Sequence, residues 1–202
     1  MKRLFPILSI LVLLVTSCNV EPVSVQQSQS QPVNPVVVEP TFMSGTLNGL
    51  QYDNLKPLTY YNSSSFQTAK ETYIHQGNSY NYLLLQGSDI TLNDNPNAQS
   101  IVINIRIPQS QWNVGTYDLK DIESVVMNNT NSCIDLVAIG AGKKAKSVSG
   151  TMSVTEFNTT THVVKGNFSF TYYLENEVGD LEGPYNFTNG QFKYSLDDPY
   201  FN

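Results

Sequence analysis

Period-two alternation of apolar and polar residues is the strongest constraint on how this chain can fold. In residues 101–107 the isoleucines take every odd position, whereas Asn104 and Arg106 take even ones. In residues 164–174 the apolar side chains take the even positions, and only Gly166 interrupts them. Because successive side chains of a strand point to opposite faces, this pattern predicts strands with one buried and one solvated face. We expect Gly166 to relieve crowding on the buried face or to mark a bulge.

The same pattern extends over most of the chain beyond residue 40. Val148–Phe157 and Val163–Leu174 form the clearest predicted hairpin, and only Asp118–Met127 is a candidate helix. Turn sequences such as Asn48-Gly49 and Asn189-Gly190 separate the predicted strands. The other strands are expected at Thr41–Leu47, Gln51–Asp53, Phe66–His75, Tyr80–Gln86, Cys133–Ile139 and Gln191–Leu196.

These elements predict an all-β fold, an antiparallel sandwich or barrel of about 8–10 strands with at most one short helix. The choice between sandwich and barrel stays open, because it depends on which strands pair. The roughly 160 residues from Thr41 onward are enough for one domain with a hydrophobic core. We therefore predict a single all-β domain over residues 41–202.

The first eighteen residues have the parts of a secretory signal peptide. Lys2 and Arg3 make the end cationic, and an apolar run follows from Leu4 to Val15. That run is about a dozen residues long, short of the roughly 20 that a helix needs to cross a bilayer. We therefore expect residues 1–17 to be a cleaved signal rather than a membrane-spanning anchor.

The residues at the expected cleavage site, Val15-Thr16-Ser17-Cys18, resemble the bacterial lipobox. The resemblance implies cleavage between Ser17 and Cys18, a diacylglyceryl group on the Cys18 thiol and an acylated, commonly palmitoylated, new amine. Two or three acyl chains suffice for stable anchoring. The resemblance thus implies a lipoprotein held in the cell envelope through Cys18; the alternative is an ordinary signal peptide with an incidental cysteine.

The residues after Cys18 predict a spacer and bear on its location. Residues 18–40 are rich in Pro, Gln and Ser and lack apolar periodicity, which is typical of a linker. As a flexible coil, residues 19–40 would span about 26 Å. An Asp directly after the lipidated cysteine would resemble an inner-membrane retention signal. This chain has Asn19 at that position, which favours the outer membrane. Only Glu21 matches the acidic residues of surface-export signals, so the periplasmic and the exposed side both stay open.

A second resemblance covers most of residues 41–196. It rests on the order of loose motifs, from Gly45-x-Leu47-Asn48-Gly49 through Ser149-Gly150-Thr151-Met152 to Asn189-Gly190-x-Phe192. In that order the chain is similar to a group of uncharacterised Bacteroidetes lipoproteins. The resemblance implies an all-β envelope lipoprotein, and it brings no activity and no site residues with it.

Charge excludes one class of partner. The chain has 11 basic and 17 acidic residues, and removal of residues 1–17 takes away Lys2 and Arg3. The mature chain then carries 9 basic residues and a formal charge of −8. Nucleic-acid binding needs clustered Lys and Arg. We therefore expect no nucleic-acid partner, and attachment to the membrane through the N-terminal lipid alone.

No motif in the sequence indicates catalysis. Few residues are candidates for a metal site or a nucleophile: His75, His162, Cys133 and Asp135. The nucleophile motif Gly-x-Ser-x-Gly does not occur. With Cys18 lipidated, Cys133 has no disulfide partner within the chain, and we expect it to pack as a small apolar residue. We predict no enzyme activity, no metal, no cofactor and no catalytic residue.

Four weaker features have both a structural and a binding interpretation. Lys143, Lys144 and Lys146 are expected on a solvated hairpin tip, with an anionic glycan or headgroup as the alternative. Asx residues around Asp94 favour a turn over calcium. Asp197 is expected in a mobile tail with Asp198. The tyrosines and Trp112 fit strand pairing, or a sugar or protein surface.

The sequence therefore predicts a lipid-anchored envelope lipoprotein whose non-enzymatic β-domain binds an unknown protein or glycan partner or serves a structural role. The alternative is a lipocalin-like carrier of a small apolar ligand, because the inward Ile and Phe rows could line a cavity instead of a core. No ligand-binding residues follow from the sequence.

Overall fold

The computed structural model describes residues 42–58, 67–89, 100–139 and 144–197. All of them belong to one compact unit, Val38–Asn202. The predictions on Ser17, Cys18 and the linker lie outside the described residues, as do those on Asp94, Lys143 and Asp198. Within the described ranges, no helix has the length and hydropathy needed to span a bilayer.

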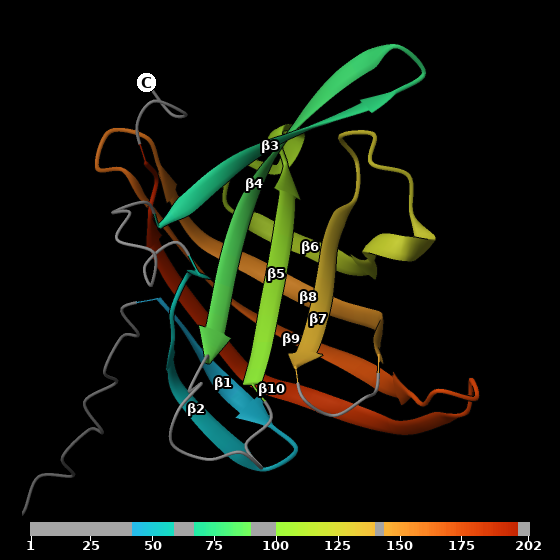
Figure 1. Ribbon diagram of the computed structural model, residues 1–202. Helices are drawn as coiled ribbons and strands as arrows, with labels where there is room; N and C mark the ends of the chain where they lie inside the picture. Colours follow the sequence, from blue (N-terminus) through green and yellow to red (C-terminus); the bar gives the residue numbers. More distant parts are fainter. Residues whose placement is uncertain (1–41, 59–66, 90–99, 140–143, 198–202) are drawn as a thin grey trace, which may run out of the picture. The chain divides into compact units, whose positions relative to one another are not determined.

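Ten strands and two three-residue 3-10 turns make up the described part of the chain (Figure 1). The turns are η1 (Gln109–Gln111) and η2 (Ile122–Ser124). The strands are β1 (Met43–Leu47), β2 (Leu50–Leu55), β3 (Thr68–His75), β4 (Asn78–Asp89), β5 (Ser100–Pro108), β6 (Gly115–Asp121), β7 (Ser132–Ile139), β8 (Lys144–Asn158), β9 (Val163–Glu175) and β10 (Leu181–Ser195).

The strands form a single sheet in the order β2-β1-β10-β9-β8-β6-β7-β5-β4-β3. The prediction of an all-β fold is confirmed. Neighbours pair antiparallel except β6 and β7, which run parallel, so the sheet is mixed. The predicted hairpin is also confirmed, since β8 pairs with β9 from Lys144↔Glu175 to Asn158↔Val163.

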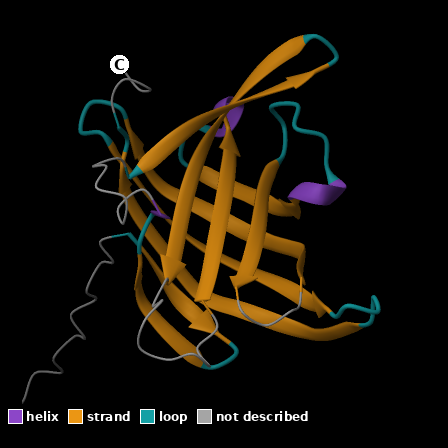
Figure 2. Ribbon diagram, in the orientation of Figure 1, coloured by secondary structure: helices purple, strands orange, loops and turns teal. Residues whose placement is uncertain are grey.

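The sheet curls on itself into a half-barrel rather than splitting into two separate sheets (Figure 2). As a result β4, β5 and β7 cross in front of β6, β8 and β9. One bridge ties the β2 end of the sheet to β4: the amide of Lys56 donates to the Ser88 carbonyl over 3.0 Å, and the Ser88 amide donates back over 2.7 Å.

A second tie joins the start of β3 to the end of β10. Asp197 Oδ2 accepts hydrogen bonds from the amides of Gln67 (2.5 Å) and Thr68 (2.7 Å). The Thr68 hydroxyl donates to the carbonyl of Ser195 over 3.1 Å. The prediction of a mobile tail is therefore wrong for Asp197, because its carboxylate satisfies backbone donors that β3 would otherwise leave unbonded.

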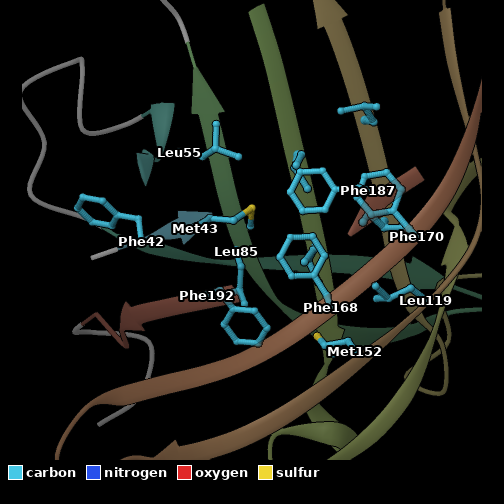
Figure 3. Packing of buried hydrophobic residues seen from close by; sticks show 14 of the residues in the cluster. Phe42, Met43, Leu55, Leu85, Leu119, Met152, Phe168, Phe170, Phe187 and Phe192 are labelled. Carbon is cyan, nitrogen blue, oxygen red and sulfur yellow. The ribbon is translucent and has the colours of Figure 1, made fainter. Parts of the chain in front are cut away.

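The hydrophobic core fills the space inside the curl (Figure 3). The isoleucines of β5 and the even-numbered apolar residues of β9 all point into it, as their alternation predicted. At its centre the ring of Phe168 stacks on Phe187 with centroids 5.1 Å apart, and Phe170 stacks on Phe187 at 5.2 Å. Phe187 is 0% exposed, so burial of these aromatic rings is a large part of the stabilisation.

Gly166 makes room for this packing. A Cβ atom at that position would lie 2.4 Å from Phe192 Cζ and 2.4 Å from the Ser153 carbonyl oxygen. The register of β8 with β9 also shifts here, because Val154 pairs with Gly166 and Glu156 with Lys165, which leaves Thr155 as an extra residue on β8. Both expectations for Gly166, relief of crowding and a bulge, are therefore confirmed.

The candidate helix at Asp118–Met127 is not formed. Residues up to Asp121 belong to β6, and only Ile122–Ser124 turn, with the Asp121 carboxylate accepting from the Glu123 amide over 3.2 Å. Leu119, 1% exposed, is the one fully buried side chain of β6. Pairing on both sides, with β7 and β8, outweighs the local helical pattern.

Candidate functional site

The outward surface of the sheet has two chemically different parts. We call the outer side of β3, β4, β5 and β7 the ionic face. It carries Glu71, Gln86, Asn104, Arg106 and Asp135. We call the outer side of β6, β8, β9 and β10 the hydroxyl face. It carries Thr116, Asp118, Lys120, Ser149, Thr151, Ser153, Asn167, Ser169, Thr171, Asn186 and Gln191.

Arg106 is the centre of the ionic face. Its Nε donates to Glu71 Oε2 over 2.7 Å and contacts the Tyr73 hydroxyl at 3.0 Å. Its Nη1 donates to Asp135 Oδ1. Only 13% of the Arg106 side chain is exposed. One guanidinium therefore joins β3, β5 and β7 through charge-assisted hydrogen bonds.

The network continues through amide side chains. Asp135 Oδ2 accepts from Asn104 Nδ2 over 2.9 Å, and Asn104 Oδ1 accepts from Gln86 Nε2 over 2.8 Å. Gln86 Oε1 in turn accepts from the amide of Leu58 over 2.8 Å. These groups use their hydrogen-bonding capacity on one another, which is typical of a network that fixes strand register.

The pKa values on this face follow from the same contacts. Burial by itself would lower the pKa of the Arg106 guanidinium, but Asp135 and Glu71 raise it above its ordinary value. Burial, and then the hydrogen bond donated to Glu71, raise the pKa of Tyr73 to about 12. Arg106 is thus a permanent cation, and Tyr73 a neutral donor, at any physiological pH.

Cys133 lies on the same face and is closed off from solvent. It is 0% exposed, and its Sγ lies 3.5 Å from Met127 Sδ. Burial raises the pKa of the Cys133 thiol to about 11. Because the thiolate is the reactive form, this thiol is chemically inert in the folded chain. It packs as the sequence predicted.

Asp135 lies on the same strand and face as Cys133, whereas the two histidines of the sequence inventory are placed elsewhere. His75 ends β3 at the tip of the β3–β4 hairpin, whereas His162 lies in the β8–β9 turn with Nδ1 3.1 Å from the Leu196 carbonyl oxygen. In the part of the chain that the structure describes, no three His, Cys, Asp or Glu side chains come together as metal ligands.

Several of the described aromatic residues, together with Lys146, are used in packing and pairing. The side chains of Tyr82, Tyr172 and Tyr194 are 0–3% exposed. Trp112 stacks on Phe157 with centroids 6.1 Å apart, and its Nε1 donates to the Ile107 carbonyl over 2.9 Å. Lys146 pairs with Glu123 at 3.0 Å and Glu175 at 3.5 Å. Lys146 thus lies within β8, is partly exposed and is paired with two carboxylates.

The hydroxyl face differs from the ionic face in its regular spacing. Cross-strand pairing places its side chains in three rows that run across the strands. The rows are Thr116–Ser153–Asn167–Gln191, Asp118–Thr151–Ser169 and Lys120–Ser149–Thr171–Asn186. The middle row meets β10 where the pairing with β9 shifts between Phe187 and Gly190.

Two adjoining hollows lie over these rows. The larger, about 570 Å³, extends from Asp118 across Thr151 and Ser169 to Thr188. The smaller, about 320 Å³, lies over Ser153, Asn167 and Gln191. Thr151 and Ser169 line both hollows.

Hydrogen bonding separates the rim of this area from its middle. In the outer rows the Thr116 and Ser153 hydroxyls bond over 3.0 Å, and Thr171 Oγ1 donates to Asn186 Oδ1 over 2.9 Å. Within the described ranges, the side chains of the middle row, Asp118, Thr151 and Ser169, make no hydrogen bond to the protein. The middle row is available to a ligand, and it is the candidate site.

Sequence reasoning did not find this site. The outward positions of Asn167, Ser169 and Thr171 were visible in the alternation of β9, but only as a wet face. Their alignment with Asp118 and Thr151 depends on β6 lying beside β8, which no local pattern reports. A search with protein-family models, a search of curated proteins and a search of solved structures each find no match to this chain.

Proposed function

We propose that this chain is a lipid-anchored lipoprotein of the cell envelope, in the outer membrane, whose non-enzymatic β-domain binds a protein or glycan partner through the hydroxyl face. Cys18 carries the lipid, residues 1–17 are removed as a signal, and residues 19–40 hold the domain away from the bilayer. The lipobox residues Val15-Thr16-Ser17-Cys18 support the anchor.

One observation carries the binding role: the middle row of the hydroxyl face lines a hollow and has no hydrogen-bond partner in the described chain. Buried polar side chains are normally bonded within the protein, as those of the ionic face are, whereas exposed ones bond to water that a ligand can replace. Asp118, Thr151 and Ser169 instead line a hollow of about 570 Å³ with their hydrogen-bonding groups free. This volume is within the range that small-molecule sites occupy.

No observation favours the alternative of a lipocalin-like carrier. Its apolar ligand would need space inside the curl, where Phe168, Phe170 and Phe187 stack on one another. Both hollows described above lie on the outer side of the sheet. Native mass spectrometry separates the two functions, because a carrier retains an apolar ligand of constant mass and a packed domain does not.

The anchor is tested by the substitution Cys18→Ser in the full-length chain. The wild type should enter the detergent phase on phase partition of cell envelopes. The variant should keep its signal peptide and lack the mass of the acyl chains, while its β-domain stays folded by circular dichroism. A wild-type chain that stays in the aqueous phase without an added lipid mass would refute the anchor.

The binding role is tested by a charged residue placed in the site, with a matched control on the same strand. Thr151→Arg places a long cationic side chain where the two hollows adjoin, whereas Thr155→Arg puts the same side chain at an exposed position of β8 that lines neither. In envelopes dissolved in mild detergent, wild type and Thr155→Arg should sediment in a complex with a protein or with a polysaccharide large enough to change the sedimentation rate, and Thr151→Arg as the monomer. Equal sedimentation of all three would contradict a binding role for this face.

A further inference from the structure

We infer that the ligand of the hydroxyl face is a neutral oligosaccharide, laid across β6, β8, β9 and β10. This inference rests on the proposed function and names the chemistry of the partner. It follows from four properties of the face: its hydrogen-bonding groups, its charge, the absence of apolar anchors and its length.

The hydrogen-bonding groups of the middle row favour a ligand rich in hydroxyls. The Asp118 carboxylate only accepts hydrogen bonds, whereas the Thr151 and Ser169 hydroxyls each donate one and accept others. A ligand that satisfies all three must present several O–H donors with lone pairs close together. Adjacent hydroxyls on a sugar ring have this arrangement. A phosphate or a carboxylate offers acceptors only, and would meet Asp118 without a donor.

Charge also favours a neutral ligand. Asp118 is the one charged member of the middle row. The nearest cation of the face, Lys120, has its Nζ bonded to Asn131 Oδ1 over 2.9 Å, at the rim. The mature chain carries a formal charge of −8. Lys120 also lines the larger hollow and partly offsets Asp118 there. Repulsion of an anionic glycan therefore comes from the charge of the molecule as a whole.

The composition of the face argues against a protein as the ligand. Protein interfaces have an apolar core, usually with aromatic anchors. Among the described residues, none of the large apolar side chains that are exposed lines either hollow. The exposed ones are Leu50, Ile74, Val114, Val126, Val137, Val178 and Leu181. Phe187 borders the larger hollow only from beneath, at 0% exposure.

The length of the face suits a chain of sugars rather than a single one. Three interstrand spacings of about 4.8 Å give about 14 Å from β6 to β10. Since no aromatic ring is exposed in the hollow, binding depends on hydrogen bonds that water also makes. Each sugar therefore contributes little, and useful affinity requires several of them to lie along the rows.

The test uses the full-length lipidated chain in lauryldimethylamine oxide, a detergent that contains no sugar. Neutral probes are maltohexaose, cellohexaose, mannohexaose and chitohexaose, and hexagalacturonate is the anionic probe. Affinity is measured by isothermal titration calorimetry, and contact by saturation-transfer difference NMR. We expect at least one neutral probe to bind and the anionic probe not to bind.

Variants then locate the binding. Thr151→Arg should abolish it, and Thr155→Arg should leave the dissociation constant within about twofold. Asp118→Ala should weaken binding about tenfold, the loss expected for one hydrogen bond to a charged acceptor. Thermal unfolding followed by circular dichroism verifies that each variant is folded before its affinity is compared.

Three results would overturn the inference: no binding of any neutral probe, binding of hexagalacturonate instead, or equal weakening by Thr151→Arg and Thr155→Arg. They are distinguishable from a failure of the proposed function. If no neutral probe binds but Thr151→Arg alone still loses the sedimenting complex, the face binds a protein and only the ligand class is wrong.

Discussion

The ionic and hydroxyl faces are two parts of one sheet, and they use polar side chains for different ends. On the ionic face Glu71, Arg106, Asp135 and Asn104 satisfy one another across three strands. On the hydroxyl face Thr151 and Ser169 face solvent without a partner in the described chain. The difference teaches that the bonding state of outward polar groups, rather than their number, distinguishes the surface that ties strands together from the surface that we propose binds a ligand.

The largest expected effect is the loss of Arg106. Arg106→Met leaves Glu71 and Asp135 facing each other without a cation, and should lower the free energy of unfolding by about 2–3 kcal/mol. This is below the range for fully buried pairs, because the two carboxylates keep 30% and 23% exposure. Urea unfolding measures it. Full recovery by Arg106→Lys would contradict the need for a planar guanidinium between two acids.

Two asparagines give a matched comparison of the faces. Asn104→Ala removes one bond each to Asp135 and Gln86 at a position only 8% exposed, and should cost about 1–2 kcal/mol of unfolding free energy. Asn167→Ala on β9 removes no protein hydrogen bond in the described residues, and should change it by less than about 0.5 kcal/mol. Equal losses in urea unfolding would remove the distinction between the two faces.

Alkaline pH should affect the ionic face through Cys133. The folded chain raises the pKa of this thiol from 9.0 to about 11, so it holds the proton more tightly than the unfolded chain does. Below pH 9 both states are protonated and nothing is lost; as pH rises from 9 towards 11, only the unfolded state ionises and stability falls. Between pH 8 and 10 the loss is about 1.4 kcal/mol.

Cys133→Ala is the control for that titration. The variant should be less stable at pH 8, yet its unfolding free energy should fall less steeply up to pH 10, because no thiol remains to ionise. Above pH 10 both proteins should lose stability, since burial raises the pKa of Tyr172 to about 12 and the sign is the same. Parallel pH profiles of the unfolding free energy for the two proteins would mean that burial does not raise the pKa of the Cys133 thiol.

The smallest expected effect is on the hydroxyl face. Thr151→Val replaces a free hydroxyl by a methyl group of similar shape in the middle of a sheet, where a β-branched residue is favoured. The free energy of unfolding should change by less than about 0.5 kcal/mol, in either direction. Saccharide binding by the same variant should weaken, which would separate the contribution of Thr151 to binding from its contribution to the fold.

Alternation predicted much of this fold and little of the site. The inward rows of β5 and β9 were readable because the spacing of the isoleucines and phenylalanines alone decides which face is buried. The strand β6 was missed because only Tyr117 and Leu119 alternate with polar residues in it, a run too short to outweigh the helical pattern of Asp118–Met127. The parallel pairing of β6 with β7 was unreadable, since it depends on strand order.

The network of the ionic face and the tie between β3 and β10 both depend on contacts between residues that are distant in sequence. Glu71 and Arg106 are 35 residues apart, and Thr68 and Asp197 are 129 apart. No local pattern connects either pair. Asp118 and Thr151 are aligned across β6 and β8 in the same way. A wet face can therefore be predicted from one strand, but whether its groups are satisfied or free is decided by the neighbouring strands.

The order of strands in the sheet limits when this domain can be completed. The first described strand, β1, pairs with the last, β10, from Met43↔Phe192 to Leu47↔Phe187. Contacts so distant in sequence form late and slowly. In a chain that emerges from its N-terminus first, β1 and β2 can pair with each other, but β1 has no neighbour on its other side until β10 follows. If the chain is exported as proposed, its sheet stays incomplete and the chain translocation-competent during synthesis. The pairing of β1 with β10 then forms only after β10 has crossed the membrane.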